Sequence, residues 1–129
     1  MSEPIWVNRQ ALELLHSESI AEHGGADGLR DEGLFESALA RPQNLLAYQG
    51  VDDVARLAAS YAFGLAKNHA FVDGNKRIAF IAAGLFLRLN GWRLTADQAE
   101  ATLVILSVAS SAMSEDELAD WIRKHMRPA

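Results

Sequence analysis

The chain has 129 residues, of which 50% are hydrophobic and 22% charged, and its formal net charge is −5. An acidic chain does not bind nucleic acid through its overall field, so we expect no direct nucleic-acid partner. Cysteine is absent, which excludes disulfides and thiolate metal sites. No apolar run approaches the ~20 residues that span a bilayer, and the N-terminus lacks the blocks of a signal peptide. We therefore expect a soluble, cytoplasmic protein that does not enter a membrane.

A chain of this length can bury roughly two-thirds of the surface that it exposes when unfolded, so it needs no metal or disulfide to fold. No internal repeat, low-complexity tract or linker interrupts the sequence. Apolar residues recur with helical spacing almost throughout. The sequence therefore predicts one all-α domain over residues 1–129.

The first predicted helix begins after Asn8, a suitable N-cap, and runs to His23, where two glycines end it. Asp31 can cap a second helix. We expect that helix to end at Pro42, because proline disfavours helical backbone in the residue before it. The segment 42–50 should then be irregular or extended.

A third helix should start at Asp52 or Asp53 and end near Asn68, with one apolar face. The fourth, Asn75 to Asn90, is apolar nearly all round, so we expect it to run through the centre of the core. Two capping boxes mark the starts of the remaining helices. They are Thr95 with Gln98 and Ser114 with Glu117. The predicted architecture is a compact bundle of about six helices around a buried central helix.

The densest chemistry lies between Asn68 and Arg77, which reads Asn-His-Ala-Phe-Val-Asp-Gly-Asn-Lys-Arg. Unpaired N–H groups and the helix dipole make the start of the fourth helix an anion site, and phosphate is the usual occupant. Lys76 and Arg77 oppose the dipole there, whereas a sequence built for stability alone would carry Asp or Glu. The pattern therefore indicates a bound phosphate, held by Gly74, Asn75 and the two cations.

Two further residues of this segment suit a reaction at a nucleotide phosphate. Asp73 can hold the divalent ion that accompanies a nucleotide, since Mg²⁺ prefers carboxylate and phosphate oxygens. Histidine exchanges protons near neutral pH, so His69 is a competent general base for an attacking hydroxyl. Because His69 and Phe71 alternate around Ala70, we expect Phe71 to anchor the loop in the core and His69 to face the reacting centre.

Each of these residues also has an ordinary structural explanation, as a loop histidine, a turn aspartate, a Gly-Asn turn or a solvated helix start. Other chemistry fits the chain less well. His16, His23 and His125 form no close pair and no His-Glu-x-x-His motif, so a zinc site is not expected. The chain has no Walker loop, because the upstream glycines of that motif are missing. No Ser or Cys lies in a nucleophile elbow.

The segment His69-x-Phe71-x-Asp73-Gly74-Asn75-Lys76-Arg77 resembles the signature of the Fic/Doc (Fido) superfamily, and specifically its short branch, the death-on-curing (Doc) toxins. The likeness covers nearly the whole chain, including Asp-Glu-Gly-Leu at 31–34 and the run 85–91. The resemblance implies a Fic/Doc fold, His69 as the base and Asp73 as the metal-positioning residue. It also implies a phosphate cradle formed by Gly74, Asn75, Lys76 and Arg77.

Differences from the AMP-transferring Fic pattern bear on the transferred group. Those enzymes usually carry glycine at the position of Lys76 and a second arginine at that of Phe80. In the Doc branch these differences accompany an inverted nucleotide. The resemblance therefore implies transfer of the γ-phosphate of ATP, with Mg²⁺, to a hydroxyl of a translation elongation factor like elongation factor Tu. Doc proteins often carry alanine at the position of Gly74, so AMP transfer to a protein hydroxyl is the alternative.

The resemblance also implies a regulatory partner. Many Fic proteins carry an inhibitory Ser/Thr-x-x-x-Glu-Gly/Asn helix, but here the nearest segment, Ser111 to Glu115, is followed by Asp116. Inhibition would then come from a Phd-like antitoxin whose C-terminal segment folds into a groove of the toxin. A catalytically silent binding module is the second alternative, which the intact His69 disfavours.

Overall fold

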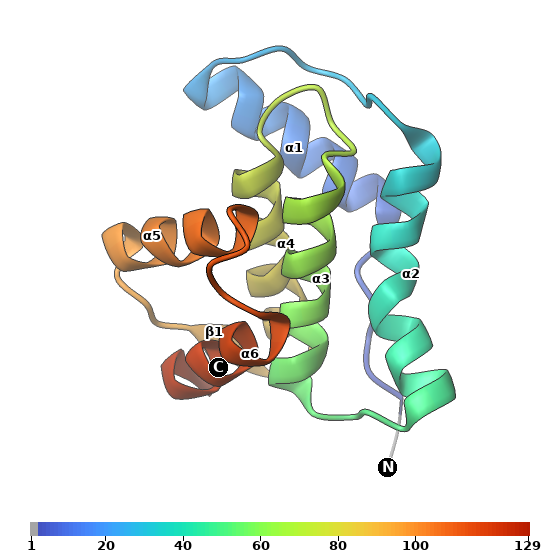
Figure 1. The fold of residues 1–129 in the computed structure, drawn as a ribbon, viewed down its shortest axis with the longest axis vertical. Helices are drawn as coiled ribbons and strands as arrows, with labels where there is room; N and C mark the ends of the chain where they lie inside the picture. The colour runs from blue at the N-terminus through green and yellow to red at the C-terminus, as the bar shows by residue number, and fades with distance from the viewer. Residues whose placement is uncertain (1–2) are drawn as a thin grey trace.

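The computed structural model describes residues 3–129, which form six helices and one two-stranded sheet (Figure 1). The helices are α1 (Arg9–His23), α2 (Glu32–Gln49), α3 (Val54–Asn68), α4 (Asn75–Leu89), α5 (Gln98–Ala109) and α6 (Glu115–His125). The strands β1 (Trp92–Leu94) and β2 (Met126–Pro128) pair antiparallel. The predicted helical bundle is confirmed, while the small sheet was not predicted. Within residues 3–129, no helix combines the length and apolarity that crossing a membrane requires.

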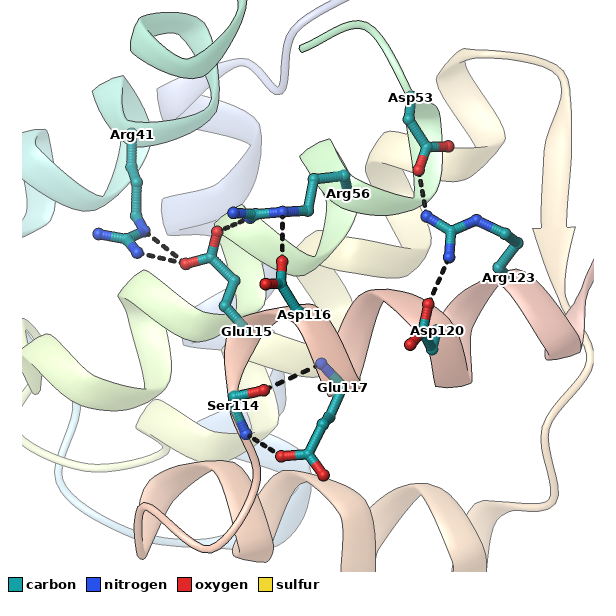
Figure 2. Close-up of polar contacts among 9 residues, drawn as sticks. All are labelled: Arg41, Asp53, Arg56, Ser114, Glu115, Asp116, Glu117, Asp120 and Arg123. Atoms are coloured by element: carbon teal, nitrogen blue, oxygen red, sulfur yellow. Dashed lines mark hydrogen bonds and ion pairs between the residues drawn. The ribbon is translucent and has the colours of Figure 1, made fainter. Parts of the chain in front are cut away.

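Most helices start at the capping residues that the sequence predicts. The side chains of Asn8, Asp31 and Asp53 accept hydrogen bonds from backbone N–H groups in the first turns of α1, α2 and α3. At α6, Ser114 and Glu117 form the reciprocal capping box (Figure 2). Such caps satisfy N–H groups that have no partner inside the helix, at about 1 kcal/mol each.

The end predicted for the second helix is wrong, because α2 continues through Pro42 to Gln49 and no irregular segment lies between them. The proline ring is fully buried, and tertiary packing here outweighs the hydrogen bond that proline removes. α2 approaches α3 closely, since a Cβ added to Gly64 would lie 3.4 Å from the Cα of Ala38. The helix stops at Gly50, which adopts the left-handed conformation.

The predicted start of α5 is also wrong. The N-cap is Asp97, whose side chain accepts a hydrogen bond of 2.9 Å from the backbone N–H of Ala99. Thr95 instead extends the pairing of the small sheet, because its N–H and its hydroxyl both donate to the backbone oxygen of His125. A contact between distant segments therefore replaces the local capping box.

The buried central helix is α3 rather than the expected α4. Ten of the 15 residues of α3 are buried, and it packs against α2, α4, α5 and α6 (Figure 1). Alanine and glycine supply six of those ten, and such small residues let neighbouring helices approach from several sides. α4 buries seven of its 15 residues.

An ion-pair cluster ties the start of α6 to α2 and α3 (Figure 2). The buried carboxylate of Glu115 lies between the guanidinium groups of Arg41 and Arg56, and Arg56 also contacts Asp116 at 3.0 Å. A buried carboxylate without a partner is strongly unfavourable. The two arginines offset that penalty and join α6 to two helices that lie much earlier in the chain.

Candidate active site

The predicted motif forms the turn between α3 and α4, alongside α1 and the segment that leads into α2 (Figure 1). His69 is the C-cap of α3 and adopts the left-handed conformation, with φ 52° and ψ 49°. This conformation is uncommon outside glycine and is a marker of functional sites. The imidazole is exposed and has no hydrogen-bond partner among residues 3–129, so it is available to take a proton.

Arg30 holds the end of α3 from the opposite side. Its Nε donates to the backbone oxygen of His69 at 2.8 Å, and its Nη2 donates to that of Asn68 at 3.4 Å. These carbonyl groups have no partner within the helix, and a cation at a helix C-terminus is also favoured by the dipole. Arg30 therefore supports the unusual backbone of His69. The sequence gives no local signal for this contact, because the two residues belong to different elements.

The segment between α1 and α2 lies along the motif. Leu29 and Phe71 form an isolated antiparallel bridge, and the backbone N–H of Ala26 donates to Oδ2 of Asp73 at 2.7 Å. Oδ1 of Asp73 has no hydrogen-bond partner among residues 3–129, and the side chain is exposed. The carboxylate is thus oriented through one oxygen and open at the other.

The interior side of the loop is fixed by Phe71 and Asn75. Phe71 is 3% exposed, so its predicted role as the anchor is confirmed. The side chain of Asn75 is buried and bonds both backbone groups of Phe71, as Oδ1 accepts from the N–H at 3.0 Å and Nδ2 donates to the oxygen at 2.9 Å. The side chain of Asn75 therefore fixes the loop, and its backbone N–H at the first turn of α4 is the group that suits an anion.

Gly74 is the N-cap of α4, with φ 77° and ψ 19°, and no side chain in the described part of the chain caps this helix. A Cβ at this position would lie 3.2 Å from Cδ1 of Ile20 and 3.4 Å from Nε2 of His16. Glycine suits the position on both counts, since it tolerates positive φ and lets the loop sit close to α1. The first N–H groups of α4 are left without a side-chain acceptor, which is the chemistry of an anion site.

Lys76 and Arg77 are exposed on the first turn of α4, and neither has an ion-pair partner among residues 3–129. Both border a groove of about 620 Å³ between α1, α4 and α5. The groove has a mostly apolar floor and a charged rim. Its lining includes Leu15, Phe80, Ile81, Ile105 and Leu106, with Glu18, Glu22 and His23. The hydroxyl of Ser19, another lining residue, is buried and has no hydrogen-bond partner within residues 3–129.

Asp73 is the one acidic residue of the motif. Residues 3–129 contain no group of three or more His, Cys, Asp or Glu side chains that could hold a metal ion. A divalent cation at Asp73 would therefore need further oxygens from a nucleotide and from water. Mg²⁺ is usually bound in this way at phosphate sites, so the open carboxylate fits a nucleotide-borne ion.

His16 is a further residue of the site that the sequence did not predict, because no other histidine lies near it in the chain. Its ring is buried beneath the motif, and its Nε2 lies 2.7 Å from the backbone oxygen of Asp73. The available signal was the spacing of Leu12, His16 and Ile20, which places the histidine on the inner face of α1.

Residues 6–87 match the model of the Fic/DOC family. That match covers more than half of the chain and includes the complete motif. Together with the helical bundle, it shows that the chain belongs to the Fic/DOC family, and the resemblance seen in the motif is confirmed.

Two known proteins are similar to this chain. The chain is 33% identical to the "Protein kinase doc" of Escherichia phage P1 over 118 residues, which are 92% of this chain and 93% of that protein. It is 49% identical to the "Toxin Doc" of Mycolicibacterium smegmatis (strain ATCC 700084 / mc(2)155) over 88 residues, 66% of this chain and 65% of the relative.

Proposed function

We propose that this protein is the toxin of a type II toxin–antitoxin module and that it inhibits translation by phosphorylating a hydroxyl of an elongation factor like elongation factor Tu. Family membership and relatives named as a kinase and a toxin support a nucleotide-dependent transferase with a toxin's role. The observation that carries the proposal is the start of α4. Among residues 3–129 no side chain caps it and neither Lys76 nor Arg77 has an ion-pair partner, and the exposed His69 begins the turn that leads to it.

In this proposal His69 is the general base. Its imidazole takes the proton of the target hydroxyl while that oxygen attacks the γ-phosphorus of ATP, and the bond from the γ-phosphorus to the β–γ bridging oxygen breaks to release ADP. Such a base typically contributes about 10²- to 10⁴-fold in rate. The exposure of the ring at the end of α3 suits a reaction with a protein target, which must reach it from solvent.

The start of α4 would hold the triphosphate. The backbone N–H groups of Gly74 and Asn75 suit phosphate oxygens, and Lys76 and Arg77 would add charge-assisted hydrogen bonds of roughly 1.5 to 3 kcal/mol each. Asp73 would hold Mg²⁺, which supplies neutralisation of phosphate charge when bound.

The residues that α4 presents to the groove favour transfer of phosphate rather than transfer of AMP. Lys76 and Phe80 lie one helical turn apart, and both line the groove. A long cation beside Gly74 restricts the space over the helix start, and the apolar ring offers no further phosphate contact where AMP-transferring enzymes usually place an arginine. AMP transfer to a protein hydroxyl is the alternative function.

We further propose that the groove between α1, α4 and α5 receives the C-terminal segment of a Phd-like antitoxin. An amphipathic helix suits an apolar floor with a charged rim. Leu106, which lines the groove, is 44% exposed on α5, so its side chain is accessible to an apolar residue of that segment. An occupant of this groove would contact Lys76 and Arg77 and so compete with the triphosphate.

The test is incubation of the protein with ATP labelled at the α- or the γ-phosphate, in the presence of purified elongation factor Tu and, separately, bacterial lysate. Transfer of the γ-label supports the kinase, and mass spectrometry then locates the phosphate. Transfer of the α-label would replace the kinase by an AMP transferase. Transfer of neither label would leave the catalytically silent binding module.

A further inference from the structure

A buried histidine outside the motif contacts the motif loop directly. His16 is 1% exposed and lies between Leu12 and Ile20 on the inner face of α1. Burying an imidazole is unfavourable unless its nitrogen atoms are bonded, so packing alone would favour an aliphatic residue at this position. The contacts of the ring therefore indicate why a histidine occupies this buried position.

One ring nitrogen is bonded to the motif. Nε2 of His16 lies 2.7 Å from the backbone oxygen of Asp73 and, because a carbonyl oxygen only accepts, Nε2 must carry the hydrogen. Nδ1 lies 3.6 Å from Oδ1 of Asp27. The Asp27 carboxylate is itself oriented by the hydroxyl of Ser17 at 3.2 Å and the N–H of Gly28 at 2.8 Å. The imidazole is thus held through Nε2, while Nδ1 faces the Asp27 carboxylate from beyond hydrogen-bond distance.

The faces of the ring are held as well. The imidazole stacks on Phe71, with ring centroids 3.8 Å apart and planes 19° apart, and Phe71 meets Phe35 edge-on at 5.0 Å. Nε2 also lies close beneath Gly74, at 3.4 Å from the position that a Cβ would take. His16 is therefore a fixed support, and the loop rests against it.

The hydrogen bond orients the peptide group between Asp73 and Gly74. In a trans peptide the carbonyl and the following N–H point in opposite directions, and no peptide bond among residues 3–129 is cis. Because the Asp73 oxygen points to His16, the Gly74 N–H points away from it. That N–H finds no acceptor among residues 3–129, so it is available to a ligand at the start of α4.

We propose that His16 is a positioning residue for nucleotide binding. Its Nε2–H holds the Asp73–Gly74 peptide so that the Gly74 N–H faces the nucleotide phosphates and Asp73 keeps its place at the helix start. His16 itself touches neither substrate. The inference rests on the proposed function, because it places nucleotide phosphates at the start of α4.

Two substitutions separate the hydrogen bond from the packing. His16→Gln keeps an N–H donor near the position of Nε2, whereas His16→Phe keeps an aromatic ring against Phe71 and removes the donor. His125 offers a matched control at the end of α6, outside the motif and the groove. Its Nδ1 also lies 2.7 Å from a backbone oxygen, that of Trp121, and its ring lies 4.6 Å from the Trp121 ring.

The experiment is NMR of the ¹⁵N-labelled full chain, titrated with ATP and Mg²⁺, alongside steady-state kinetics with labelled ATP. In the wild type we expect His16 to be protonated at Nε2 and the Gly74 amide signal to shift on titration. His16→Phe should weaken that response and lower kcat/KM for ATP by about 10- to 100-fold, the cost typical of losing a contact that orients a metal-ligating residue, which is the proposed role of Asp73. His16→Gln should recover most of the loss, and His125→Phe should match the wild type.

The positioning role is overturned if His16→Phe binds ATP like the wild type, or if His16→Gln is as impaired as His16→Phe. Two results on the wild type alone would also overturn the positioning role. One is a neutral His16 that carries its hydrogen on Nδ1, and the other is a Gly74 amide signal that does not shift with ATP. Failure of the proposed function is a separate result. A protein that shows the expected shifts but transfers no γ-phosphate supports the positioning role and refutes the kinase.

Discussion

Replacement of Phe71 by alanine should lower the free energy of unfolding by about 3 to 5 kcal/mol. The ring is 3% exposed and lies between the His16 imidazole at 3.8 Å and the Phe35 ring at 5.0 Å. Both partners are fixed on buried helix faces, so they cannot move to fill the space. The substitution therefore loses the transfer free energy of the ring and leaves a cavity, and it also removes aromatic contacts that contribute roughly 0.5 to 1.5 kcal/mol each.

Thermal unfolding followed by circular dichroism measures this effect. A loss of that size corresponds to a fall in Tm of roughly 10 to 20 °C for a chain of this length. Val72→Ala is the matched control, since Val72 is 48% exposed in the same loop and its truncation should change stability by less than about 0.5 kcal/mol. If Phe71→Ala melted within the range of the control, the ring would not be the anchor of the loop.

Three other substitutions probe the general base, the orientation of the bound nucleotide and the ion-pair cluster. His69→Ala should lower γ-phosphate transfer by about 10²- to 10⁴-fold while leaving Tm nearly unchanged, because the exposed ring has no partner among residues 3–129; a variant that remains toxic in cells would exclude His69 as the base. Lys76→Gly should lose γ-label transfer and gain α-label transfer if Lys76 enforces the inverted nucleotide, and mass spectrometry of the target reads the product; undiminished phosphorylation would contradict this role. Glu115→Gln should destabilise by about 1 to 3 kcal/mol, because it weakens charged hydrogen bonds to two arginines, whereas Asp116→Asn, at an 80% exposed side chain, should have an effect near zero. Equal unfolding free energies of these two variants in urea would show that the buried cluster does not stabilise α6.

The features predicted correctly from the sequence depend on neighbouring residues. Asn8, Asp31 and the Ser114–Glu117 pair cap their helices because the atoms that meet lie within one turn. The motif is equally local. One short turn connects His69 and Asp73 to the start of α4, although residues distant in sequence hold that turn in place.

The features that the sequence did not predict all depend on packing between distant segments. Pro42 should end a helix by local preference, yet its ring is buried within α2. Thr95 matches a capping box, but its N–H and hydroxyl donate to the backbone oxygen of His125 at the end of α6. His16 and Arg30 join the site only because the fold places α1 and its following segment beside the motif. Local patterns cannot show which distant residues supply such contacts.

The start of α4 has a consequence for how the molecule responds to its ligand. Without a cap and with two cations, this helix start is less stable than one built with acidic residues, so the α3–α4 turn should exchange its amide hydrogens faster than the core of α3. A bound anion would reverse that local weakness. By mass action, a ligand at 100 times its Kd raises the free energy of unfolding by about 2.7 kcal/mol. If the proposed nucleotide binds there, the residues that lower the stability of this helix start also make its binding a source of folding stability.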